Sequence, residues 1–126
     1  MMKQIGLTIF GVTGLLAVTA LTVEAARPVI RVRCETRPNR SKISVDLNNV
    51  PSGTYTANVT SAGNNVSSTL QSVGDEVEFD FDSDSEDIAD GAAAISGAFI
   101  VNRAITVQVI GPANLSKTAK CAAKRR

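Results

Sequence analysis

The feature that most constrains the fold of this chain is the alternation of apolar and polar residues at every second position. The clearest example is residues 77–82, VEFDFD, in which valine and phenylalanine alternate with carboxylates. Successive side chains of a β-strand point to opposite faces, so this pattern predicts strands that are buried on one face. Similar alternation recurs in residues 29–34, 43–47, 55–59, 66–73, 105–109 and 115–121. The sequence therefore predicts about seven short strands.

Turn-forming residues separate these segments, as in NNVPSG at 48–53, AGNN at 62–65 and GPAN at 111–114. Short strands spaced by such turns are typical of a small antiparallel β-sandwich. In strand number and spacing, residues 26–126 resemble immunoglobulin-like and fibronectin-III-like domains, although the buried tryptophan of antibody domains is absent. Residues 83–101 do not alternate, and we expect a helical turn near 88–94 and an edge segment at 99–101.

The N-terminus has the pattern of a secretory signal peptide. Lys3 precedes nineteen uncharged residues, Ile5–Val23, which are followed by Glu24-Ala25-Ala26. A basic start, an apolar run and small residues at the cleavage site predict a signal peptide at 1–25 and a mature domain at 26–126. The expected location is therefore secreted or periplasmic, without stable membrane insertion after cleavage. The alternative is a retained membrane anchor, because nineteen apolar residues can just span a bilayer.

The residue types that are missing exclude several functions. The chain has no histidine and no tryptophan, and both methionines lie in the predicted leader. Without imidazole, there can be no Ser-His-Asp or Cys-His nucleophile system and no histidine-ligated metal. One tyrosine and three phenylalanines remain after cleavage, too few for stacking sugars or nucleic-acid bases. We therefore expect a non-enzymatic protein that binds no nucleic acid.

The two cysteines predict a structural disulfide. Cys34 ends the first alternating segment and Cys121 ends the last, both on the apolar face. If these two strands run parallel and side by side, the sulfur atoms lie level. Export would permit oxidation. The alternative, a redox-active pair, lacks the C-x-x-C spacing and an adjacent histidine.

The charged residues are strongly segregated along the sequence. Residues 26–42 carry six Arg and Lys and one Glu, whereas residues 75–90 carry nine Asp and Glu and no basic residue. Residues 103–126 carry six Arg and Lys and no acid. One interpretation is mutual compensation, in which basic terminal strands lie near an acidic central strand. The other is a dipolar module whose faces dock on charged partners.

The acidic segment also contains candidate ligands for calcium, which prefers six to eight oxygen atoms. We take these ligands to be Asp80, Asp82, Asp84, Glu86 and Asp87. The D-x-D-x-D spacing from Asp80 matches the start of an EF-hand loop, but the sixth position is serine instead of glycine and the twelfth is glycine instead of glutamate. A calcium site in the loop 80–91 is thus the alternative hypothesis; no other cofactor is expected.

The leading hypothesis is a small exported β-sandwich that serves as a binding or structural module. Its expected interaction surface is the acidic segment 75–90, and its partner is either an unknown protein or a second copy of the chain. Like charges along a strand at a sheet edge also discourage aggregation, which is the simpler explanation of the same residues.

Overall fold

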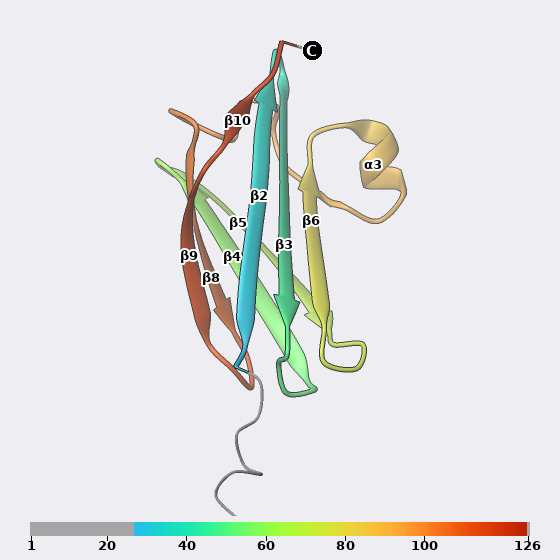
Figure 1. The fold of residues 1–126 in the computed structure, drawn as a ribbon. Coiled ribbons are helices and arrows are strands. Elements are labelled where there is room, and N and C mark those ends of the chain that lie inside the picture. Colours follow the sequence, from blue (N-terminus) through green and yellow to red (C-terminus); the bar gives the residue numbers. More distant parts are fainter. Residues whose placement is uncertain (1–26, 126) are drawn as a thin grey trace, which may run out of the picture.

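The structure is a computed structural model, and it describes residues 27–125. The predicted signal peptide at 1–25 lies outside the described residues. Residues 27–125 form two β-sheets packed face to face (Figure 1), which confirms the predicted all-β sandwich. No helix in this range is long and apolar enough to cross a membrane.

The first sheet has the strand order β10-β2-β3-β6-β7. Its three long strands are antiparallel neighbours: β2 (Val29–Arg37), β3 (Arg40–Asn48) and β6 (Val77–Asp82). A two-residue strand runs parallel to each outer strand: β10 (Ala122–Ala123) beside β2, and β7 (Ala93–Ala94) beside β6.

The second sheet has the strand order β5-β4-β8-β9, and all its pairings are antiparallel. Its strands are β4 (Thr54–Ser61), β5 (Asn64–Gln71), β8 (Ala104–Ile110) and β9 (Leu115–Lys120). The short helix α3 (Ser85–Ala89) follows β6 and lies beside the first sheet (Figure 1).

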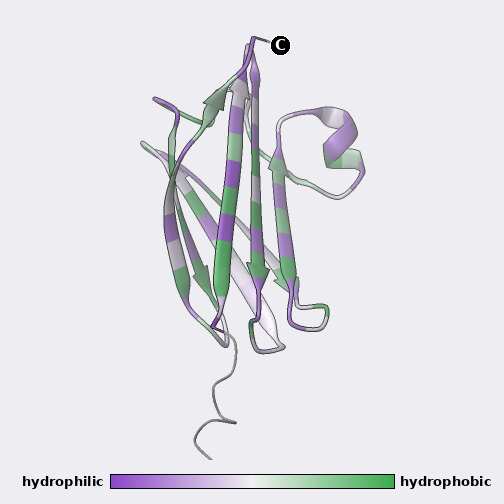
Figure 2. Cartoon of the chain, viewed as in Figure 1, coloured by the Kyte–Doolittle hydropathy of each residue, from purple (hydrophilic) through white to green (hydrophobic). Residues whose placement is uncertain are grey.

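The core lies between the sheets and is built by the alternation seen in the sequence. Apolar residues of β3 and β6 face those of β4 and β8, and most of them are fully buried. Figure 2 shows the resulting bands of apolar and polar residues along each strand. The largest buried side chain is Tyr55, whose hydroxyl donates a hydrogen bond to the Pro51 carbonyl at 2.6 Å. The only polar atom of that side chain is therefore satisfied inside the core.

All seven predicted strands are present, but residues 83–101 differ from the expectation. The helical turn lies at 85–89 instead of 88–94, because the chain turns directly after β6. The expected edge segment at 99–101 is not a strand: Phe99 and Ile100 are buried, and Val101 makes only an isolated bridge to Ala104. Burial of two apolar residues, and not sheet pairing, explains the apolar run at this position.

The predicted disulfide between Cys34 and Cys121 is present. The first and last long strands do not pair directly, because β9 belongs to the second sheet. Instead, the chain crosses between the sheets at Cys121, and β10 then pairs parallel with the end of β2. The bridge therefore joins the two sheets close to the C-terminus.

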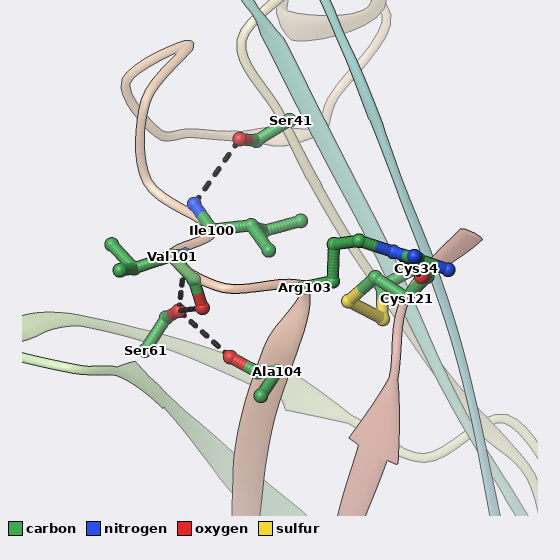
Figure 3. The surroundings of a disulfide bond; sticks show 8 residues. All are labelled: Cys34, Ser41, Ser61, Ile100, Val101, Arg103, Ala104 and Cys121. Atoms are coloured by element: carbon green, nitrogen blue, oxygen red, sulfur yellow. Dashed lines mark hydrogen bonds between the residues drawn. A yellow bond between two sulfur atoms is a disulfide. The ribbon is translucent and has the colours of Figure 1, made fainter. Parts of the chain in front are cut away.

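Two buried serines form hydrogen bonds with the segment that crosses between the sheets before β8 (Figure 3). The Ser41 Oγ accepts a hydrogen bond from the Ile100 amide at 3.2 Å and donates one to the Gly97 carbonyl. The Ser61 Oγ accepts one from the Val101 amide at 2.7 Å. These hydroxyls satisfy backbone groups that have no partner in either sheet.

Candidate functional site

Strand β6 carries the middle of the acidic segment on the outer face of the first sheet. Its apolar residues enter the core, so Glu78 and Asp80 project outward and are exposed. The Ser44 hydroxyl on β3 donates a hydrogen bond to Asp80 Oδ1 at 2.9 Å. Asp82 lies at the end of the same face but is only 1% exposed. The acidic segment is therefore not one uniform solvated edge.

Arg40 at the start of β3 compensates the buried Asp82 carboxylate. The guanidinium group donates two hydrogen bonds, from Nε to Oδ1 at 3.2 Å and from Nη2 to Oδ2 at 3.0 Å. The Asp84 amide donates a third, to Oδ1 at 2.9 Å. Burial by itself raises the pKa of Asp82, but the hydrogen bonds and positive charge of Arg40 outweigh it and lower the pKa to about 2.

The same guanidinium reaches Asp87 in helix α3, where Nη2 lies 2.9 Å from Oδ2. Lys42 Nζ lies 3.8 Å from that oxygen. Hydrogen bonding to the Asp82 carboxyl and the negative charge of that group nevertheless raise the pKa of Asp87, because they outweigh the positive charges of Lys42 and Arg40, which lower it. Through its ion pair with Asp87, Arg40 thus links α3 to the first sheet.

The five residues predicted to bind calcium have different surroundings in the structure. Arg40 pairs with both Asp82 and Asp87, Asp84 immediately precedes α3, and Asp80 and Glu86 are exposed. Within residues 27–125, no group of three or more such side chains is arranged to hold a metal ion. Calcium binding by the loop 80–91 stays a prediction, and any ion would have to displace Arg40 to use all five carboxylates.

The outer face of the first sheet carries rows of charge that run across its three long strands. One row contains Arg31, Asp46 and Glu78 on β2, β3 and β6, as the strand register shows. The next row contains Arg33, Ser44 and Asp80 in the same order. The side of this face formed by β2 is therefore basic and the side formed by β6 is acidic.

Compensation between these charges is incomplete. Arg33 Nη2 lies 3.0 Å from Asp46 Oδ2, and Arg40 pairs with Asp82 and Asp87 as described. Among the described residues, Arg31 and Glu78 form no ion pair, nor does Asp80. The predicted mutual compensation is confirmed near α3, but the middle of the sheet keeps charges of both signs on opposite sides.

The outer face of the second sheet is chemically different. Along β4 and β5, the outward residues carry hydroxyl or amide groups and no charge: Thr54, Thr56, Asn58, Thr60, Asn65, Ser67, Thr69 and Gln71. Charged residues of the strands thus concentrate on the first sheet. This division identifies the first sheet as the candidate interaction surface.

Sequence reasoning did not identify Arg40 as the partner of Asp82. The two residues lie 42 positions apart and meet only because β3 and β6 are neighbours. The alternation in β3 places Arg40 and Lys42 on the outer face of that strand, so the sequence does indicate that both could pair with outward carboxylates. It does not indicate which strand is the neighbour of β3.

No family model, curated protein or solved structure matches this chain. The function is therefore inferred from the geometry of the first sheet.

Proposed function

We propose that this protein is an exported, non-enzymatic interaction module that binds a basic, extended segment of a partner along the acidic edge of β6. The observation that carries the proposal is that β7 covers only Phe81 and Asp82 of this strand. Residues 77–80 have no strand partner on that side within residues 27–125. Exposed carboxylates line the same stretch, and an open edge can accept an added strand.

Two further features support export and the absence of catalysis. The disulfide is compatible with an oxidising environment, in agreement with the predicted leader and a secreted or periplasmic location. Both cysteines are engaged in the bridge, and the chain contains no histidine, so the usual activated nucleophiles are missing.

We also propose that the sandwich is of the immunoglobulin-like or fibronectin-III-like type. The first, second and fifth long strands form one sheet, and the third, fourth, sixth and seventh form the other. The first, second and fifth strands thus match A, B and E of such domains, and the third, sixth and seventh match C, F and G, with the fourth strand added beside the third.

Binding of synthetic strand peptides tests the proposed function. The probe is a fluorescent peptide of alternating lysine and valine, and the matched control peptide has glutamate in place of lysine. Fluorescence anisotropy should show binding of the lysine peptide only. Substituting Glu78→Gln with Asp80→Asn should abolish binding, whereas Glu86→Gln with Asp90→Asn, in the same acidic segment but off the strand edge, should preserve it. Equal binding of the two peptides, or binding unaffected by the β6 substitutions, would contradict the proposal.

A further inference from the structure

The first sheet has a second open edge, and its charge is opposite to that of β6. Strand β10 pairs only with Glu35 and Thr36, so residues 29–34 of β2 have no strand partner on that side within the described part of the chain. Arg31 and Arg33 project outward along this stretch and are exposed. The two open stretches therefore differ in sign while belonging to the same sheet.

The two open stretches also lie at the same level of the sheet. The register aligns Arg31 with Glu78 and Arg33 with Asp80, in each case across one residue of β3. Strands β2 and β6 are both antiparallel to β3, so they are parallel to each other. A second copy shifted sideways along the sheet would thus place residues 30–33 of its β2 parallel to residues 77–80 of the first copy's β6, in register and with the same face outward. The pairing ends there, because β7 covers Phe81 and Asp82 on one copy and β10 covers Glu35 and Thr36 on the other.

We infer that a second copy of this chain is the partner, joined head to tail through the β6 edge of one copy and the β2 edge of the next. This inference rests on the proposed function, because it names the occupant of the acidic edge. Across the junction, Glu78 lies beside Arg31 of the next copy and Asp80 beside Arg33. Opposite charges on adjacent strands stabilise a sheet, and like charges destabilise it.

The second sheet adds no charge repulsion to this head-to-tail contact. Strand β5 lies near β6, and β9 lies near β2, at the two sides of the sandwich. Strand β5 carries no charged residue, whereas β9 carries Lys117 and Lys120. No like charges meet where β5 faces the β9 of the next copy. Each copy keeps one open edge of each kind, so the contact is heterologous and repeats into a chain or closes into a ring.

A charge-swap experiment tests the inference by sedimentation velocity at low ionic strength over a range of protein concentrations. The acidic-edge variant carries Glu78→Lys and Asp80→Lys, and the basic-edge variant carries Arg31→Glu and Arg33→Glu. Wild type should form oligomers that grow beyond the dimer with concentration. Each variant alone should associate about tenfold or more weakly, since both of its edges then carry the same sign.

Mixing the two variants distinguishes loss of complementarity from misfolding. The lysines of one variant face the glutamates of the other, so an equimolar mixture should recover the oligomers that neither variant forms alone. The matched control, Glu86→Lys with Asp90→Lys, makes the same change in net charge away from the edge and should associate like wild type. Circular dichroism verifies that all variants keep the β fold.

Three results would overturn the inference: a monomeric wild type, a mixture that stays monomeric, or association that is insensitive to both edge variants. The last result would indicate pairing through the uncharged β5 edge. If wild type binds the lysine peptide under the same conditions but does not self-associate, the inference fails while the proposed function stands. If neither occurs, both fail.

Discussion

The pair formed by Arg40 and Asp82 allows the electrostatic argument to be tested quantitatively. In the variant Arg40→Met, the aliphatic part of the side chain is retained but the guanidinium is removed. Asp82 is 1% exposed and would keep only the hydrogen bond from the Asp84 amide. Its carboxylate would then be buried without a compensating positive charge.

The expected loss of unfolding free energy is about 3 kcal/mol. Removing one partner of a buried ion pair costs roughly 3–5 kcal/mol. The Arg40 side chain is 24% exposed, so water can partly replace it, which favours the lower end of this range. For a domain of this size, the loss corresponds to a decrease in Tm of about 12–15 °C. Urea unfolding monitored by circular dichroism measures the free energy directly.

The pH dependence gives a second, independent readout. In wild type, the pKa of Asp82 is lowered from its ordinary 3.8 to about 2, so its stabilising contribution is present above pH 3.8 and is lost as pH falls towards 2. In Arg40→Met, burial without the guanidinium should raise this pKa above the ordinary value. Protonation then relieves the buried charge, so the variant should recover stability relative to wild type as pH falls from 7 towards 4.

Two controls complete the test. Arg33→Met removes an ion pair whose arginine side chain is 66% exposed, and it should cost less than about 1 kcal/mol. The double variant Arg40→Met with Asp82→Asn removes both charges but keeps the oxygen that accepts from Asp84, and it should recover part of the loss. Compensation of Asp82 by Arg40 is refuted if Arg40→Met lowers the unfolding free energy no more than Arg33→Met, or if the loss in Arg40→Met is the same at pH 7 and pH 4.

Three further predictions concern the crossings between the sheets and the acidic loop. Replacing Cys34 and Cys121 by alanine opens a loop with a sequence separation of 87 residues and should lower the free energy of unfolding by about 4–5 kcal/mol. Urea unfolding of the variant and of the oxidised protein measures this loss, and an unchanged midpoint would contradict it. Ser41→Ala and Ser61→Ala each leave a backbone amide of the segment before β8 without its acceptor, so each should lower the free energy of unfolding by about 1–3 kcal/mol. The control Ser44→Ala, on the outer face, should lower it by less than about 0.5 kcal/mol. Arg40 already forms ion pairs with two of the five carboxylates proposed as calcium ligands, so the Tm of the protein should be the same in calcium and in excess chelator. A rise in Tm with calcium would instead support the calcium hypothesis.

The sequence by itself determined the seven long strands, the buried face of most of them and the disulfide. These features were predictable because alternation is a local property: Val77, Phe79 and Phe81 must share one face of an extended strand wherever that strand lies. The bridge was predictable because only two cysteines are present and each ends an alternating segment. The location of the helical turn was misjudged because five residues give too weak a periodic signal.

Only the tertiary structure decided which strands are neighbours, and the candidate site depends on that choice. The adjacency of β3 and β6 buries Asp82 beside Arg40, so this predicted metal ligand is also half of an ion pair. The order β2-β3-β6 sets Arg31 and Glu78 on the same row at opposite edges of one sheet. Strand order is a global property, because the pairing of distant segments depends on how the whole core packs, and no short stretch of sequence encodes it.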